Sequence, residues 1–301
     1  MKRKLKLLII LMLVILAACS KEEDLKLVSL KGPTSMGLVY TKAAKTMDLV
    51  SAPDEILGKV TGKEADLAMV PINMAANLYQ KMDGQVRLLA VNTVGNLYLL
   101  GKEPLNDFED LEGKTIVSAG QGATPMYILN YLTKGINVKV DYLPTHSDVI
   151  ASASENRGDY YLLPEPFVSL YLNKIEGGQL AYNLAEAYKE KTGHLLTMGC
   201  LITTEDKLKE KGNEIEKFLK EYESSVDKVL NDPKAAAGLI KSYGILEDES
   251  LAEKALPSSG IVYLKPQESK EDVEAFLQLL MEENPKAIGG ALPEDDFYEA
   301  N

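Results

Sequence analysis

Hydrophobic residues along the chain follow two alternating patterns. Short apolar runs rich in β-branched residues and leucine predict strands, and stretches with apolar residues on one helical face predict helices. The strands are expected at Leu25–Leu30, Asp48–Ala52, Asp66–Ile72, Val86–Thr93, Leu97–Lys102, Lys114–Ala119, Lys139–Leu143 and Asp159–Leu163. The helices between them are expected at Gly37–Thr46, Asn73–Met82, Pro125–Lys134 and Ser147–Asn156. This alternation is typical of α/β folds with parallel strands.

The pattern changes near Thr203, where long charged helices replace the alternation. They are expected at Lys207–Leu230, Pro233–Tyr243, Ser250–Ala255 and Lys270–Glu283, after a late strand at Leu195–Thr203. The whole chain is thus predicted to be an α/β protein of two lobes, with mixed sheets and a helical C-terminal region.

The division into lobes depends on where the first sheet ends. We expect it to end in the strand pair Val86–Thr93 and Leu97–Lys102, with a crossing near Lys102. Lobe I would then comprise residues 25–101 and 196–301, and lobe II residues 102–195. Ligands of open α/β sheets bind beyond the carboxyl ends of the strands, so the loops there are the candidate site.

Residues 1–18 have the pattern of a secretory signal. Four cationic residues precede an apolar run from Leu7 to Ala18, whose 12 residues are too few to span a bilayer, which takes about 20. Leu16-Ala17-Ala18-Cys19 resembles the lipobox of bacterial lipoproteins, although a plain signal with a chance cysteine is the alternative. We expect lipid on Cys19 to anchor the mature chain at the outer face of the cell membrane, with residues 19–24 as a tether.

Charge and cysteine content narrow the possible partners. Without the signal the chain has 29 Lys and Arg against 45 Asp and Glu, a formal charge of −16, which argues against nucleic acid. Cys200 is the only cysteine besides Cys19, so stability must come from a hydrophobic core and not from disulfides.

Two loops between a strand and a helix are candidate ligand contacts. Residues 31–37 (Lys-Gly-Pro-Thr-Ser-Met-Gly) and residues 118–125 (Ser-Ala-Gly-Gln-Gly-Ala-Thr-Pro) both offer glycines, a hydroxyl cap and free helix N–H groups. Asn73, Thr93 and Glu165 follow other strands. Capping or turn bonding explains Asn73 and Thr93 equally well, and a hinge or a contact between lobes explains Glu165 equally well.

Three stretches resemble the nitrate/taurine-type substrate-binding proteins of ABC importers, a group that includes thiamine-precursor binding proteins. They are Gly113–Ile116 with Gly120–Pro125, Lys63–Pro71 and Leu163–Phe167. The resemblance implies the type II periplasmic-binding-protein fold, whose two lobes close on a ligand by hinge motion. It also implies a monomer that has no cofactor, metal or enzyme activity and that delivers a solute to an ABC permease and ATPase complex. The ligand contacts that it implies are Thr34, Ser35, Met36, Pro71, Asn73, Thr93, Gln121, Gly122, Ala123, Thr124 and Glu165.

The scarcity of cations in these loops bears on the cargo. After the signal only two arginines remain, Arg87 and Arg157, and neither lies in a candidate loop, which excludes a bidentate arginine clamp on an anion. Lys31 is the one cation in these loops. We therefore predict a neutral or heterocyclic solute such as a vitamin precursor, with a small organic anion as the alternative. With no tryptophan in the chain, stacking would fall to Tyr40, Tyr79, Tyr98, Tyr127 or Phe167.

Catalysis is the competing class of function. The same fold resembles futalosine-pathway enzymes of menaquinone biosynthesis and pyrimidine synthases of thiamine biosynthesis. The synthases need a histidine-rich, iron-linked site, whereas this chain has only His146 and His194. An export signal also disfavours cofactor biosynthesis, so binding is predicted over catalysis. The sequence does not separate a role in transport from a role in sensing.

Overall fold

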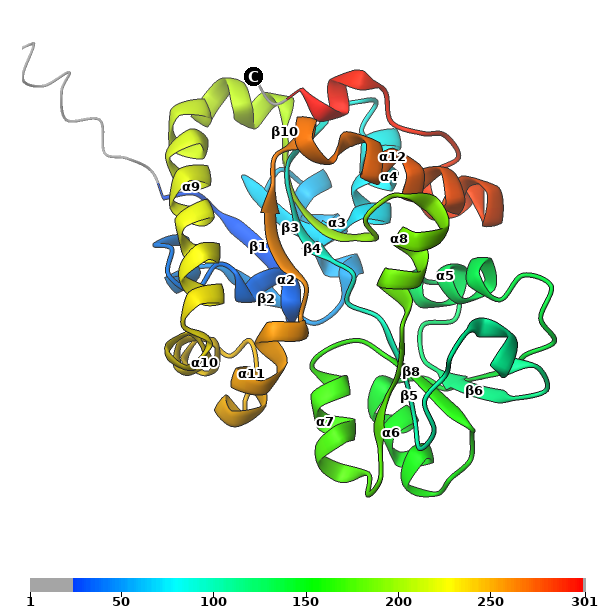
Figure 1. The fold of residues 1–301 in the computed structure, drawn as a ribbon. Coiled ribbons are helices and arrows are strands. Elements are labelled where there is room, and N and C mark those ends of the chain that lie inside the picture. Colours follow the sequence, from blue (N-terminus) through cyan, green and yellow to red (C-terminus); the bar gives the residue numbers. More distant parts are fainter. Residues whose placement is uncertain (1–23, 300–301) are drawn as a thin grey trace, which may run out of the picture.

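The structure is a computed structural model that describes residues 24–299, and in this part of the chain the strands form two sheets (Figure 1). We call the larger sheet with its helices lobe I and the smaller one lobe II. The strand order in lobe I is β11 (Ile261–Leu264), β4 (Val86–Val94), β10 (Thr197–Thr204), β3 (Leu67–Pro71), β1 (Leu27–Leu30) and β2 (Asp48–Val50). The order in lobe II is β7 (Lys139–Tyr142), β6 (Thr115–Ser118), β8 (Tyr160–Leu163), β5 (Tyr98–Gly101) and β9 (Gln179–Asn183). Both sheets are mixed, as predicted.

Helices cover both faces of each sheet. Those of lobe I are α2 (Pro33–Met36), α3 (Pro53–Thr61), α4 (Ile72–Lys81), α9 (Glu205–Asn231), α10 (Pro233–Ser242), α11 (Glu249–Ala255) and α12 (Pro266–Glu283). Those of lobe II are α5 (Thr124–Leu132), α6 (His146–Ser154), α7 (Phe167–Lys174) and α8 (Leu184–Thr192). No helix in residues 24–299 has the length and apolar character needed to cross a bilayer.

The predicted pairing of Val86–Thr93 with Leu97–Lys102 is wrong. Strand β5 pairs with β8 and β9 of lobe II, while β4 pairs with β10 and β11 of lobe I. The chain therefore passes from one sheet to the other at residues 95–97, a few residues before the predicted crossing near Lys102. Two consecutive apolar runs with a glycine between them look like a hairpin in sequence, and only their partners reveal that they separate.

The predicted helix Gly37–Thr46 is also replaced by other structure. Residues 37–42 form turns, and Ala43–Lys45 form a 3₁₀ helix. Ser225 of α9 explains the difference, because its hydroxyl donates to the Gly37 carbonyl (2.6 Å) and accepts from the Tyr40 N–H (3.1 Å). These backbone groups are thus bonded to another part of the chain and not to each other.

Two strands have no counterpart in the predictions. Both β9 and β11 lie at the edge of their sheets, and β11 interrupts the segment predicted to be helical. The remaining predicted strands and helices agree with the structure to within a few residues. The signal and Cys19 lie outside the described residues.

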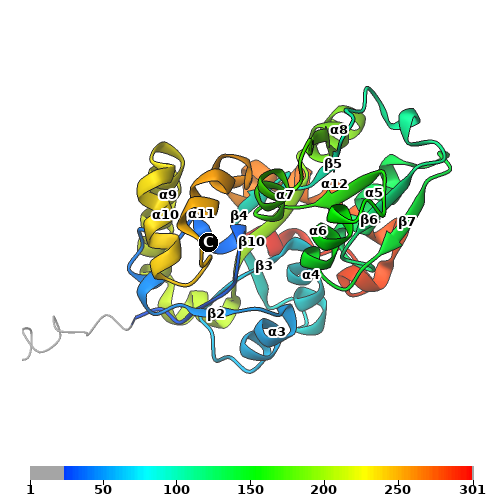
Figure 2. The same ribbon diagram turned by 90° about the horizontal axis from the view of Figure 1, so that it is seen from below.

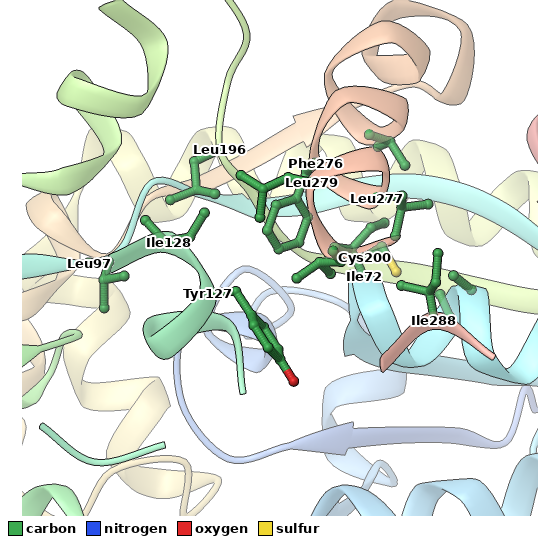
Figure 3. Packing of buried hydrophobic residues seen from close by; sticks show 14 of the residues in the cluster. Ile72, Leu97, Tyr127, Ile128, Leu196, Cys200, Phe276, Leu277, Leu279 and Ile288 are labelled. Carbon is green, nitrogen blue, oxygen red and sulfur yellow. The ribbon is translucent and has the colours of Figure 1, made fainter. Parts of the chain in front are cut away.

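The two lobes share a hydrophobic core on one side only. One cluster of buried residues runs from lobe I into lobe II, and it includes Phe276 and Leu279 of α12, Ile128 of α5 and Leu97 and Leu196 beside the crossings (Figure 3). A second cluster lies under α9 in lobe I, and a third lies under α6 and α7 in lobe II. On that side the lobes have separate cores.

A buried ion pair attaches the start of α9 to the sheet of lobe I. The Asp66 side chain is 1% exposed and lies 3.1 Å from Lys207 Nζ and 3.0 Å from Lys211 Nζ, and it accepts the Lys26 N–H at 2.9 Å. Burial alone would raise the pKa of Asp66, but the hydrogen bonds from Lys26, Lys211 and Lys207 outweigh it and lower the pKa.

We expect Asp66→Asn to lower the free energy of unfolding at pH 7 by about 3 kcal/mol, because it removes the buried carboxylate with which Lys207 and Lys211 both pair. A carboxylate whose pKa is lowered by folding stabilises the protein above its unfolded pKa. That contribution is lost as the pH falls through the folded pKa, so the difference between wild type and variant should shrink in acid. Denaturant unfolding at several pH values measures it.

The matched control is Asp206→Asn, which removes an exposed ion pair with Lys63 (2.6 Å). Exposed pairs are worth at most about 1 kcal/mol. If both variants lost the same free energy of unfolding, Asp66 would not be a buried ion pair of greater weight than the exposed pair of Asp206.

Candidate functional site

Gly199 of β10 marks the point where the candidate residues of lobe I meet. It pairs with Pro71 of β3 on one side and with Thr93 of β4 on the other. A Cβ atom built there would lie 2.6 Å from Thr34 Cγ2, 2.7 Å from Asn92 Oδ1 and 3.2 Å from Thr93 Oγ1. The absence of a side chain at Gly199 therefore lets three predicted contacts, Thr34, Pro71 and Thr93, come together.

The other predicted contacts of lobe I differ in how accessible they are. Ser35 and Met36 are buried, and Ser35 Oγ donates to the Gly32 carbonyl at 3.0 Å, while Met36 packs in the core under α9. Thr34 and Asn73 are half-buried, at the starts of α2 and α4. Thr34 and Asn73 can thus reach a ligand more readily than Ser35 or Met36.

The buried hydroxyl of Thr197, two residues before Gly199, has no protein hydrogen-bond partner among the described residues. Buried polar groups without partners are uncommon, so a water molecule or a polar ligand atom is expected to bond there. Asn92 is also buried, but its side chain is engaged: Oδ1 accepts the Thr93 hydroxyl at 3.1 Å, and the amide lies within hydrogen-bonding reach of Tyr222. Neither Thr197 nor Asn92 is among the contacts predicted from the sequence.

The loop before α5 carries the candidates of lobe II. Gln121, Gly122 and Ala123 are exposed, and Thr124 is half-buried at the first position of the helix. Gly122 has a positive φ of 77°, which favours glycine, and its carbonyl accepts the Tyr127 hydroxyl at 3.0 Å. The Tyr127 hydroxyl in turn accepts from Asn284 Nδ2 (2.7 Å), beyond α12. The loop is therefore tied through Tyr127 to lobe I.

An aromatic pair lies at the same edge of lobe II. Strands β6, β7 and β8 are parallel, so the loops that follow them share one edge of the sheet. His146 and Phe167, the first residues of α6 and α7, stack there with ring centroids 4.8 Å apart and planes 25° apart. Burial lowers the pKa of His146, which favours the neutral imidazole.

Glu165 is buried and its carboxylate is already bonded. Oε1 accepts the hydroxyls of Ser258 (2.5 Å) and Ser169 (3.0 Å), and Oε2 accepts the Ser169 N–H (3.0 Å). Burial raises the pKa of Glu165, and the bonds from these serines partly offset the rise. Ser258 belongs to the 3₁₀ turn η3 (Leu256–Ser258) of lobe I, so the geometry matches the alternative of a contact between lobes.

A surface cavity of ≈ 340 Å³ lies beside Glu165. Its polar lining includes Tyr98, Ser169, Lys254 and Ser258, and its apolar lining is Val168, Leu172 and Leu180. Among residues 24–299, no group of three or more His, Cys, Asp or Glu side chains could hold a metal ion.

The solved structures similar to this chain show its fold. An ABC transporter structure from Parabacteroides distasonis matches at a TM-score of 0.79 and 23% identity, covering 91% of this chain and 98% of that one. The periplasmic aliphatic sulphonate binding protein of Escherichia coli matches at a TM-score of 0.68 and 13% identity, covering 88% and 90%. The ligand-binding component of an ABC-type import system from Staphylococcus aureus matches at a TM-score of 0.64 and 18% identity, covering 91% and 96%.

The fold is therefore the two-lobed α/β fold of periplasmic binding proteins, which confirms the predicted fold class. Within that fold, the family model described as menaquinone biosynthesis matches residues 33–256, and the chain belongs to this family. No curated protein sequence matches the chain significantly.

We expect Gly199→Ala to reduce the free energy of unfolding by about 1–3 kcal/mol, because the added methyl group overlaps Thr34 and Asn92 and must displace α2. Thermal or denaturant unfolding measures the loss.

Gly58→Ala, in α3 with no atom within 4 Å of the new Cβ, is the matched control. It should be neutral or stabilising by up to about 1 kcal/mol. A Gly199→Ala protein as stable as the control would show that the strands there are less closely packed than the structure indicates.

Proposed function

We propose that this chain is a solute-binding protein that holds a small organic molecule between its two lobes. The observation that carries the proposal is the placement of polar groups at the carboxyl ends of strands in both lobes. Thr34, Pro71 and Thr93 meet around Gly199 in lobe I, and residues 121–124 offer exposed backbone groups and the Thr124 hydroxyl in lobe II. Open α/β sheets bind their ligands at such edges.

The cargo that these groups suit best is a neutral or heterocyclic solute. Arg87 pairs with Glu205 and Asp296 (3.4 and 3.0 Å), and Arg157 pairs with Glu155 (2.5 Å). Both arginines in residues 24–299 are thus engaged elsewhere, and the aromatic faces of His146 and Phe167 would favour a flat ring. A small organic anion, such as the sulphonate in the name of the Escherichia coli protein, is the alternative.

The cellular setting of the proposal follows from the amino terminus and the solved structures. An exported chain with lipid on Cys19 would present its cleft outside the cell membrane and pass its solute to an ABC permease and ATPase complex. The similar structure from Parabacteroides distasonis is named as an ABC transporter, and the one from Staphylococcus aureus as the ligand-binding component of an ABC-type import system, which supports this assignment. A monomer suffices, because both sides of the cleft come from one chain.

Family membership favours a second candidate function. The family is described by menaquinone biosynthesis, so the same cleft could convert a precursor of menaquinone instead of releasing it unchanged. Glu165 and His146 are titratable groups at this edge of lobe II whose pKa values burial shifts, upward for Glu165 and downward for His146. A catalyst would use such groups, whereas a binding protein needs only their shape and hydrogen bonds.

Native mass spectrometry of the protein as purified distinguishes these candidates. A bound small molecule that is recovered unchanged, at one copy per chain, would support solute binding. If the bound compound is lost on purification, titration tests the two solute classes, with a hydroxymethylpyrimidine as the heterocyclic solute and with taurine and nitrate as the small anions. Chemical conversion of the bound compound with repeated turnover would overturn the proposal in favour of catalysis.

For the solute so identified, we expect Thr124→Ala to weaken binding about tenfold, because it removes one hydrogen bond and the side chain at the start of α5. Isothermal titration calorimetry measures the affinity.

Thr133→Ala, at the other end of the same helix, is the control, since the Thr133 hydroxyl donates only to the Leu129 carbonyl. Unchanged affinity in the Thr124 variant would show that the loop before α5 is not part of the site.

A further inference from the structure

Glu165 lies where three parts of the molecule meet. It lies two residues before α7 in lobe II, Ser258 belongs to η3 in lobe I, and residues 95–97 join β4 to β5 between the lobes. Figure 2 shows α7 beside α11, and the two helices are in contact. The hydrogen bonds of Glu165 run to all three parts.

The carboxylate supplies the link between lobes. Ser258 Oγ donates to Glu165 Oε1 at 2.5 Å, whereas both bonds from Ser169 come from within lobe II. The Glu165 side chain is held by Ser169 and presented to Ser258.

Glu165 and Ser258 are each held by a residue in or directly after the crossing segment. The Glu165 N–H donates to Asn96 Oδ1 at 2.7 Å, and the Tyr98 hydroxyl donates to the Ser258 carbonyl at 2.9 Å. Asn96 and Tyr98 thus fix Glu165 on one side and Ser258 on the other. A third bond between the same elements joins Lys254 Nζ of α11 to Asn173 Oδ1 of α7 at 2.9 Å.

The position of these bonds determines their mechanical effect. On the other side of the sheets the lobes share a continuous apolar core, whereas on this side the cores under α9 and under α7 are separate. Ser258 is half-buried, so water can replace its bond to Glu165. A shared apolar core resists separation, while a few polar contacts at a partly wet boundary can open.

We propose that Glu165 and Ser258 form a latch that holds the lobes in the closed arrangement, with Asn96 and Tyr98 as its positioning residues. The latch would control how far the two lobes open for a solute, and in that respect it rests on the proposed function. Whether the latch is formed can be measured with no solute present. Without the latch, the lobes turn about the shared core and the closed state is less populated.

Ser258→Ala is the direct test. Removing one hydrogen bond to a carboxylate should raise the population of the open state about tenfold. In the solute-free protein we expect a larger radius of gyration by small-angle X-ray scattering, and roughly tenfold faster hydrogen exchange in η3 and at the start of α7, the two elements that the latch joins.

Two variants give the comparison. Ser258→Thr keeps the hydroxyl and should restore wild-type scattering and exchange. Ser242→Ala, whose hydroxyl donates only to the Leu239 carbonyl at the end of α10, should change neither. If Ser258→Ala fails to fold, Tyr98→Phe removes the neighbouring bond to the Ser258 carbonyl and serves as the test.

The outcomes separate the latch from the function. Scattering and exchange identical to wild type in Ser258→Ala or its substitute would overturn the latch, even for a chain that binds a solute. An open Ser258→Ala protein that binds no solute would support the latch and count against the proposed function.

Discussion

Residues 95–97 carry the chain from the larger sheet to the smaller one, which begins at Tyr98, and the relative position of the lobes depends on how this segment is held. The Gly95 N–H donates to the Leu196 carbonyl (2.8 Å), so the outgoing and returning crossings are bonded to each other. Gly95 has a φ of 57°, and a Cβ there would lie 2.8 Å from the Ala185 Cβ, so a larger residue would push α8 away. The next residues face different surroundings: Leu97 lies in the shared core, and Asn96 and Tyr98 reach the polar boundary.

This arrangement makes the two sides of the molecule unequal. Phe276 and Leu279 of lobe I and Ile128 of lobe II pack into one core on one side, and separating them would expose apolar surface to water (Figure 3). On the other side Glu165 exchanges one hydrogen-bond partner for water when the lobes part. Motion of the lobes should therefore keep the apolar contact and break the polar one.

The sequence predicts the local elements well and their partners poorly, for a physical reason. Periodicity reports which face of an element is buried, and it predicts the place of most strands and helices. It says nothing about which strand lies alongside, so the segment Leu97–Lys102 was assigned to the wrong sheet. The helix expected at Gly37–Thr46 failed for a similar reason, because Ser225, far away in the chain, bonds its backbone groups.

The same distinction applies to the candidate site. The sequence indicates which loops follow strands, and such loops are expected to meet at one edge of a sheet. The structure brings Thr34, Pro71 and Thr93 together in this way. Gly199, Asn92 and Ser258 were not found, because their importance arises from contacts between distant strands or between lobes. Glu165 was found through its prolines, but only the position of Ser258 shows that its carboxylate faces the other lobe.

The charges near the candidate loops bear on the proposed solute. Both arginines of the described chain pair with carboxylates outside these loops, and burial lowers the pKa of His146, which favours its neutral form. The carboxylate of Glu165 is surrounded by hydroxyl and amide donors. Apart from the exposed Lys31, these loops therefore present mostly backbone, hydroxyl and aromatic surface to a ligand. Such a surface selects by shape and hydrogen bonding rather than by charge, and this favours a neutral ring over a strong anion.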